Sequence, residues 1–365
     1  LIASDDILLP HHLEYVINEF KKNNKITTVF TQNKAEAEEL FSIICEFEEE
    51  TYIYPEIDIL KRYTTKSNDL MQNSIKVLEN IVTKTPSIII IPIEAIYRTV
   101  KNPKDFKDNS FEINLDTEIS FNDLQKKLVN MGYRKVESVD VVGEFSKRGS
   151  IVDIFSPLSE KPVRLDFFDD ELDSIRLFDE STQKSLKKVD KIEIYPTSDF
   201  FLTSEEKDIV VGKLQGKLND KKLKELENYQ DINQYLKEKI ELYHATGDFS
   251  SLESFSNLIY KIPFSIIDYL DENTIIFFDN YHKILEKIEG LREYFLTNLQ
   301  EINRNYIFQE VIDSHAFEKL QNINTVKYYL STLKLNEKII EKNYNLDIRD
   351  LAYYSSEEFL AKEIR

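Results

Sequence analysis

The sequence predicts an α/β fold: a parallel sheet covered by helices, with a small strand-rich module in its middle. Over residues 1–115, short apolar runs alternate with helical patterns, which is typical of parallel strands joined by helices. Between residues 133 and 196 the pattern changes to closely spaced short strands. After Thr203 long charged helices return, followed by one more apolar run that indicates a buried strand.

Periodicity and length place the individual elements. Helices are expected over residues 11–22, 34–47 and 69–82, and strands over residues 26–31, 51–54 and 86–91. A short amphipathic helix follows over residues 121–130, and the late strand covers residues 274–279. Residues 321–365 are expected to begin another small domain or a linker.

Within the module, residues 163–168 have the alternation of a strand. One face is apolar, whereas the other carries Arg164, Asp166 and Phe168, and a polar turn is expected at residues 169–172. An aromatic residue beside two opposite charges is the composition of a protein–protein hot spot. The alternative is that Phe168 packs beneath the next turn while Arg164 and Asp166 form a surface ion pair of little energetic weight.

Composition limits the class of protein. The chain has 365 residues and 41% hydrophobic content, enough for two or three domains. Its net charge of -19 argues against broad nucleic-acid binding, which needs a concentrated positive face. The apolar runs are far shorter than the roughly 20 residues of a membrane helix. The single cysteine, Cys45, excludes an internal disulfide and favours a cytoplasmic location. We also expect the chain to be a piece of a longer protein.

The sequence predicts no catalytic, cofactor or metal site. A phosphate-binding loop needs the pattern G-x-x-x-x-G-K-[ST], but residues 1–10 read LIASDDILLP, without glycine or lysine. The nearest imitation, GKLQGKL at residues 212–218, is one residue short between its glycines and lacks the hydroxyl. No serine lies in a nucleophile elbow, and the five histidines lack the spacing of metal ligands.

A run of motifs carries a family resemblance. Residues 143–185 contain GEFSKRG, IVDIF, PVRLDFFDDELDSIR and LFDESTQKS in order. Their order and spacing resemble the module shared by the excision-repair protein UvrB and the bacterial transcription-repair coupling factor family, Mfd. Weaker likeness extends through TYIYPEIDILKRYTTKSN, SIIIIPIEAIY and IPFSIIDYLDENTIIFFDN, and so covers most of the chain up to about Gly290.

The resemblance implies a domain organisation. It implies a degenerate RecA/helicase-like domain, UvrB-like but without a Walker A motif, into which a small α+β UvrA-binding domain is inserted. The two halves of the α/β domain would cover residues 1–118 and 201–320, with the inserted domain at residues 119–200. The late strand at residues 274–279 would return to the first sheet.

The resemblance also implies a docking site. In this family the module binds UvrA, and its contact residues match Arg148, Arg164 and Phe168 here. Asp166 stands where UvrB has an acidic residue and is expected to orient one of the arginines. Whether Glu144 or Arg176 joins this face stays open.

The family's motor residues are changed in this chain. UvrB-like helicase cores end the late strand with an aspartate, a glutamate and, two residues further, a histidine, whereas here the positions hold Asp279, Asn280 and His282. An asparagine cannot accept the proton that the glutamate would take. The connection between Tyr54 and Ile88 is also too short for the DNA-clamping hairpin of UvrB.

These departures favour the N-terminal region of a transcription-repair coupling factor over UvrB. The expected role is a non-catalytic adaptor that recruits UvrA to RNA polymerase stalled at DNA lesions, in the bacterial cytoplasm and without membrane contact. ATP, magnesium and double-stranded DNA are expected only for the C-terminal translocase of the full-length protein. The alternatives are an active UvrB-like DNA-binding ATPase, and an unrelated α/β enzyme with an acidic substrate site.

Overall fold

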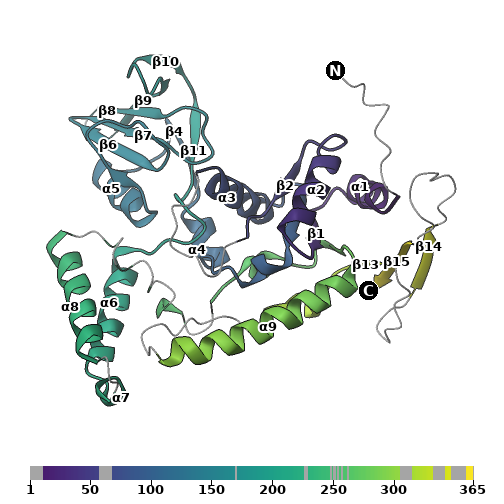
Figure 1. The fold of residues 1–365 in the computed structure, drawn as a ribbon. Helices are drawn as coiled ribbons and strands as arrows, with labels where there is room; N and C mark the ends of the chain where they lie inside the picture. Colours follow the sequence, from purple (N-terminus) through teal and green to yellow (C-terminus); the bar gives the residue numbers. More distant parts are fainter. Residues whose placement is uncertain are drawn as a thin grey trace.

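The computed structural model describes residues 11–56, 68–168, 171–225, 229–246, 249, 252, 255, 258–260, 263–304, 315–331, 342–346 and 359–364. Residues 1–10, at the expected position of a phosphate loop, and residues 169–170 of the expected turn lie outside these ranges. Figure 1 shows an α/β part, a strand-rich module beside it and a group of helices below the module.

The α/β part is built from both ends of the chain. Its elements are α1 (His11–Asn23), β1 (Thr27–Thr31), α2 (Lys34–Ile44), β2 (Thr51–Ile53), α3 (Asn68–Thr83), β3 (Ile88–Pro92), η2 (Ile93–Tyr97), α4 (Pro103–Asp108), η4 (Ile266–Tyr269), β12 (Ile275–Phe278), α9 (Tyr281–Arg304), α10 (Ala316–Asn322), β13 (Lys327–Ser331), β14 (Lys342–Leu346) and β15 (Phe359–Ile364). The predicted helices and strands of this part are confirmed within a few residues, the largest difference being that α2 ends three residues early.

The strands form one mixed sheet in the order β14-β15-β13-β12-β1-β3-β2. The five strands from β2 to β13 are parallel, and β15 is antiparallel to β13 and β14. β12 pairs directly with β1, with Val29 opposite Phe277. The expected return of the late strand to the first sheet is therefore confirmed.

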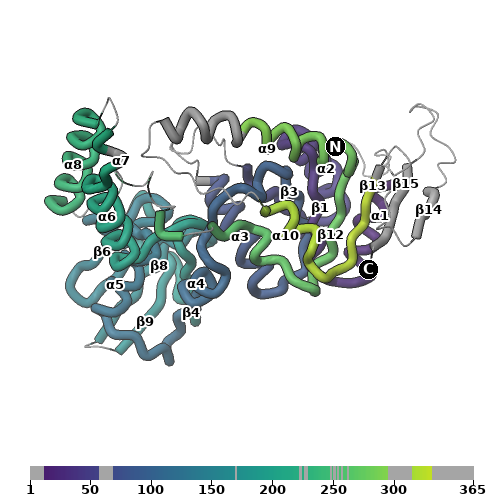
Figure 2. The backbone as a smooth tube through the Cα atoms, turned by 90° about the horizontal axis from the view of Figure 1, so that it is seen from below, coloured from purple at the N-terminus to yellow at the C-terminus, as the bar shows by residue number. Residues whose placement is uncertain are grey.

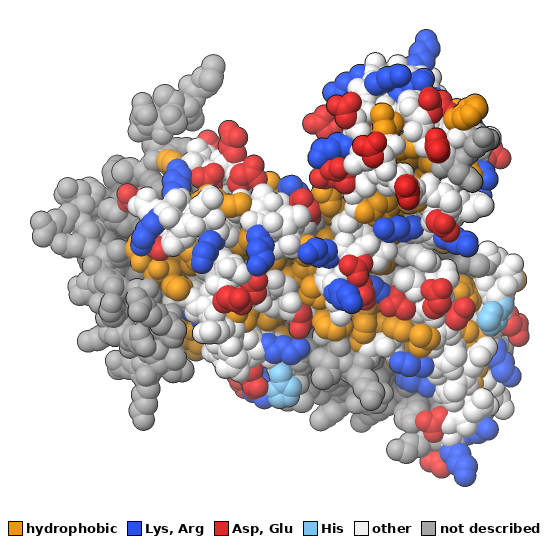
Figure 3. All heavy atoms as spheres, turned by 180° about the vertical axis from the view of Figure 1, so that it is seen from behind, with side chains coloured by type: hydrophobic (Ala, Val, Ile, Leu, Met, Phe, Trp, Pro, Cys, Tyr) orange, Lys and Arg blue, Asp and Glu red, His pale blue; other side chains and the backbone are white. Residues whose placement is uncertain are grey.

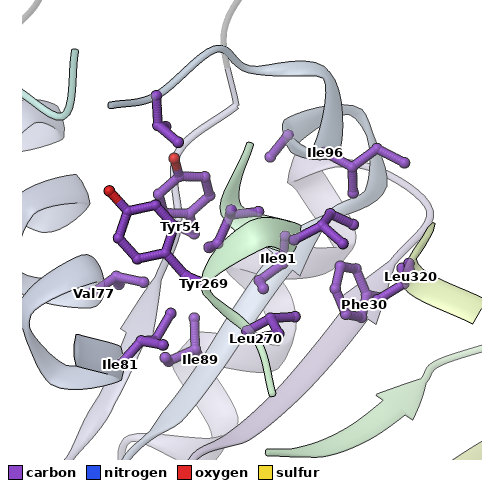
Figure 4. Packing of buried hydrophobic residues seen from close by; sticks show 14 of the residues in the cluster. Phe30, Tyr54, Val77, Ile81, Ile89, Ile91, Ile96, Tyr269, Leu270 and Leu320 are labelled. Atoms are coloured by element: carbon purple, nitrogen blue, oxygen red, sulfur yellow. The ribbon is translucent and has the colours of Figure 1, made fainter. Parts of the chain in front are cut away.

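Both faces of this sheet are buried, because the strands carry apolar residues on each side. On β1, Phe30 packs into the core that contains α3, η2, η4 and α10 (Figure 4). Its neighbour Val29 packs into the second core, against α1 and α2. The same division occurs on β12, where Phe278 faces the first core and Phe277 the second. The continuous apolar runs in the sequence follow from this two-sided burial.

The strand-rich module has its own core. It contains β4 (Phe111–Asn114), α5 (Phe121–Asn130), β5 (Arg134–Lys135), β6 (Glu144–Arg148), β7 (Ile151–Ile154), β8 (Val163–Phe168), β9 (Glu171–Phe178), β10 (Ser185–Lys188) and β11 (Lys191–Ile194). Six strands form a sheet in the order β10-β9-β8-β7-β6-β5, antiparallel except for β5 and β6, while β11 pairs with β4. Helix α5 buries Leu124 and Leu128 against one face of the six-stranded sheet.

A helical group follows the module. It consists of α6 (Ser204–Leu218), α7 (Lys221–Lys224) and α8 (Tyr229–Thr246). Val210 and Leu214 on α6 meet Leu236 and Ile240 on α8 in a core separate from that of the sheet. Seen from below, this group lies beside the module and away from the strands of the large sheet (Figure 2).

Two buried ion pairs join the segment that enters the module to the segment that leaves it. Arg98 donates from Nε to Asp199 Oδ2 at 2.5 Å, and their side chains are 5% and 1% exposed. Ser74 on α3 donates to the same carboxylate at 2.6 Å. Lys101, also buried, pairs with Glu206 at the start of α6. These contacts hold the module at the edge of the α/β part.

The structure divides the chain at other points than expected. The module begins near Phe111, before residue 119, because β4 pairs with β11 at the module's far end. Helices α6, α7 and α8 form the separate helical group, and the described residues between Ser204 and Thr246 contribute no strand to the large sheet. In the C-terminal part, β13 pairs in parallel with β12, so the described strands after residue 321 extend the large sheet instead of starting a new one. Glu171 and Leu172, which were expected in a turn, belong to β9.

Candidate functional site

The candidate site is the face of the six-stranded sheet that lies opposite α5, called the outer face below. Strand register places two rows of residues on it. The first row crosses β7, β8, β9 and β10 and holds Asp153, Arg164, Arg176 and Lys188 in directly opposed positions. The second row crosses β6, β7, β8 and β9 and holds Arg148, Ile151, Asp166 and Ser174. The sheet therefore brings all four predicted contact residues to one face, since Phe168 follows Asp166 by two positions on β8.

Arg164 is fixed by a buried carboxylate. Its Nε donates to Asp153 Oδ1 at 2.7 Å and its Nη2 donates to Oδ2 at 2.8 Å, so the pair is bidentate. Asp153 is 1% exposed and the Arg164 side chain 19% exposed. The hydrogen bonds to Asp153 raise the pKa of Arg164, against the opposing effect of burial. The guanidinium also lies over the ring of Phe178, 4.6 Å from its centroid.

This geometry corrects the expected role of Asp166. The carboxylate that orients Arg164 belongs to Asp153, on the neighbouring strand, and not to Asp166 on the same strand. Asp166 is half-buried and adds a weaker electrostatic attraction to Arg164. The sequence contains a signal for Asp153 that the strand analysis missed. An aspartate inside the apolar run IVDIF needs a partner when the strand is buried, and an arginine directly opposite can supply one.

Arg148 lies on β6 near the end of the outer face and is exposed. Its Nε donates to the backbone carbonyl of Glu137 at 2.9 Å, which holds the guanidinium against the preceding loop. Glu144, whose role was open, is buried. Its carboxylate accepts hydrogen bonds from the backbone of Asp140 and Val141 and pairs with Arg134. Glu144 therefore shapes the loop beside Arg148 and leaves its own carboxylate unavailable to a partner.

Phe168 is the most exposed large hydrophobic residue of the described chain, with 75% of its surface open to solvent. A register shift between Asp166 and Phe167 lies immediately before it. Phe167 turns into the module core against Phe121, whereas Phe168 stands out at the end of β8. The alternative in which Phe168 packs beneath the next turn is therefore wrong. An exposed aromatic ring on a face that also carries fixed charges has the composition of a protein–protein hot spot.

The changed motor residues lie at the end of β12. The backbone N–H of Asp279 donates to the carbonyl of Phe30 at 2.8 Å. The pKa of Asp279 is raised to about 7, mainly by burial. Repulsion from Glu36 and Glu39 also raises it, whereas attraction to Lys283 lowers it. Asn280 has a φ of 52°, in the left-handed region that asparagine tolerates better than most residues.

His282 is exposed and lies 3.4 Å from Glu286 on the first turns of α9. Within the described part of the chain, no hydrogen bond joins the side chain of His282 or Asn280 to that of Asp279. Throughout the described ranges, no group of three or more His, Cys, Asp or Glu side chains has the geometry to hold a metal ion. Among the same residues, none of the helices combines the length and apolar character needed to cross a bilayer.

The strand-rich module corresponds to a known domain class. Residues 111–200 match the family model of the UvrB interaction domain, and this range agrees with the module from β4 to the strand exit after β11. The chain as a whole is similar to transcription-repair-coupling factors. It is 31% identical over 327 residues to the protein of Staphylococcus epidermidis and 29% identical over 321 residues to that of Staphylococcus aureus.

These alignments cover 86% of this chain but only 27% of each relative. The chain thus spans about a quarter of the length of the curated relatives it matches, in their N-terminal region. The expected likeness to the N-terminal region of a transcription-repair coupling factor is confirmed.

Proposed function

We propose that this chain is a non-catalytic adaptor that binds UvrA and so links transcription to nucleotide excision repair. The observation that carries the proposal is that one sheet face presents the exposed ring of Phe168 together with Arg148 and the fixed guanidinium of Arg164. Binding anchors of this type combine an aromatic residue that enters a recess with arginines that meet carboxylates. Similarity to the UvrB interaction domain supports the choice of partner.

Two features favour an adaptor over a nucleotide-driven motor. The sequence lacks a phosphate-binding pattern, and Asn280 replaces the general-base glutamate. Asn280 also occupies a left-handed turn position, which fits a residue chosen for backbone conformation more than for proton transfer. In our proposal, ATP, magnesium, double-stranded DNA and RNA polymerase belong to the rest of a full-length coupling factor that releases stalled polymerase.

The test is calorimetric titration of the chain with UvrA, using Phe168→Ala and Leu115→Ala as a matched pair. Leu115 is also an exposed large hydrophobic residue, 49% open, but it follows β4 and lies off the outer face. Loss of a buried aromatic anchor typically costs about 2 kcal/mol or more of binding, so we expect Phe168→Ala to weaken binding roughly 30-fold. Leu115→Ala should bind as the parent does.

Both variants should melt at the parent temperature, because each removes an exposed side chain. Parent protein that shows no binding at concentrations sufficient for micromolar affinity would reject the adaptor proposal. Equal weakening by both substitutions would reject the outer face as the site.

A further inference from the structure

The outer face carries two cations, Arg176 and Lys188, that make no ion pair with any residue that the structure describes. Arg164, Arg176 and Lys188 lie in directly opposed positions on β8, β9 and β10. Like charges placed opposite one another destabilise a sheet. Asp153 compensates only the first of the three, because both of its oxygens are engaged by Arg164. Neither Arg176 nor Lys188 has an ion pair within the part of the chain that the structure describes.

Three carboxylates of the module are engaged by lysines elsewhere. Asp179 and Glu180, in the turn that joins β9 to β10, both pair with Lys161. Glu112 pairs with Lys191 on β11. The Nε of half-buried Arg176 has no hydrogen-bond partner among the described residues, although burying such a group without one costs stability. The arrangement therefore has an unmet requirement for negative charge at Arg176 and Lys188.

The position of this charge is also informative. The chain has a net charge of -19, but basic side chains gather at the tip of the module, at β10 (Figures 1 and 3). Figure 3 shows Lys and Arg side chains gathered at this tip, and every residue of β10 is exposed. β9 and β10 continue the sheet directly from β8, so the charge is continuous with the face that presents Phe168.

We propose that Arg176 and Lys188 extend the docking face over β9 and β10 and bind carboxylate side chains of the protein partner. This inference rests on the proposed function and assigns different roles to the three cations. Arg164 is held by Asp153 and supports the face, whereas Arg176 and Lys188 receive their counter-charges from the partner. Because its Nε is buried, Arg176 would meet a carboxylate through the terminal nitrogens of its guanidinium.

Protein carboxylates fit this surface better than nucleic-acid phosphates do. Asp166 and Glu171 lie on the same face, Glu171 directly opposite Phe168. A phosphate backbone would pass close to these negative groups, and two cations are too few for a firm polyanion site. Separate carboxylates on a folded partner can reach the two cations and avoid the acidic positions.

The experiment compares Lys188→Glu with Lys187→Glu. Lys187 is the adjacent residue of the same exposed strand, but it pairs with Leu177, which packs against the module core on the opposite face. The two variants therefore change net charge equally and differ in the face they alter. Arg176→Gln, which removes charge at a half-buried position with little change of shape, is the third variant. Affinity for UvrA is measured by calorimetry at two salt concentrations, with melting temperature as the folding control.

We expect Lys188→Glu and Arg176→Gln each to weaken UvrA binding about tenfold and to reduce its salt dependence, while Lys187→Glu stays within twofold of the parent. Parent-like affinity of both Lys188→Glu and Arg176→Gln, with Phe168→Ala still defective, would overturn this inference and leave the adaptor function intact. Failure of the parent to bind UvrA would instead reject the proposed function. The last measurement is titration with a DNA duplex. Duplex binding that depends on Lys188 would overturn the inference, because the two cations would then bind phosphates and not protein carboxylates.

Discussion

Asp153 on β7 holds Arg164 on β8 through two parallel hydrogen bonds of 2.7 and 2.8 Å, with the aspartate almost fully buried. The pair links the module's interior to the outer face. A guanidinium fixed in this way loses little side-chain entropy when a partner arrives, and fixed groups bind more tightly than mobile ones. If the outer face docks a partner as we propose, buried Asp153 would prepare it for binding without touching that partner.

Replacement of Asp153 should damage both stability and binding. In Asp153→Ala the charge of Arg164 loses its buried partner, and breaking such a pair typically costs about 3 kcal/mol or more. Asp166→Ala removes a half-buried carboxylate that makes no hydrogen bond to Arg164, so its cost should be clearly smaller. Urea unfolding of the two variants measures the difference. Equal stability of both variants would show that Asp153 does not have the role assigned to it.

A second prediction concerns the junction between the module and the α/β part. Asp199→Ala would leave Arg98 buried without its carboxylate and should lower the free energy of unfolding by about 3 kcal/mol or more. The control is Lys191→Ala, which breaks the exposed pair with Glu112 and should change stability little. Denaturant unfolding of both variants tests this, and a small effect of Asp199→Ala would mean that the Arg98–Asp199 pair contributes little to the stability of the junction.

The fold was largely predictable because the local pattern of apolar and polar residues indicates which side chains are buried. Continuous apolar runs such as residues 88–91 require a strand covered on both faces, and alternation over residues 163–168 places Phe168 on the outer face. What local pattern does not contain is pairing between strands. The partner of Arg164 lies eleven residues away on another strand, and the pairing of β4 with β11 joins residues nearly eighty apart. Both were therefore missed.

The packing of the helical group and the pairing of β13 were not predicted for the same reason. Helices α6 and α8 have ordinary amphipathic patterns, and nothing in those patterns says whether they cover a sheet or pack on each other. Likewise, β13 is a short strand whose membership of the large sheet depends on its pairing with β12. A sequence pattern reports which face of an element is buried, but not which element buries it.

A third prediction tests the absence of nucleotide binding. A ligand that binds only the folded state raises the melting temperature, by an amount equivalent to about 2.7 kcal/mol at one hundred times its dissociation constant. We expect millimolar ATP with magnesium to leave the melting temperature of this chain unchanged. Magnesium chloride with sodium sulfate at matched ionic strength is the control for salt effects. A shift specific to ATP would favour the active UvrB-like ATPase over the adaptor.

The fourth prediction uses the titration of Asp279. Its pKa is about 7 in the folded protein, against 3.8 for an ordinary aspartate, so the folded state keeps a proton that the unfolded state loses between these values. The free energy of unfolding should therefore fall as the pH rises from about 4 to 7. Asp279→Asn keeps the shape without the titrating proton and should remove that part of the decline, giving a gain of about 1 kcal/mol or more over the parent at pH 8.

Asp271 provides a control of opposite sign. Burial raises the pKa of Asp271, but hydrogen bonds from Asn273 and the charge of Lys84 outweigh this effect, so the pKa is lower than that of an ordinary aspartate. Its contribution to stability is present at neutral pH and disappears on acidification, so Asp271→Asn should be less stable than the parent at pH 8 and approach it in acid. Urea unfolding across pH 4 to 8 measures both variants. If Asp279→Asn follows the parent at every pH, Asp279 ionises normally and the end of β12 is open to water.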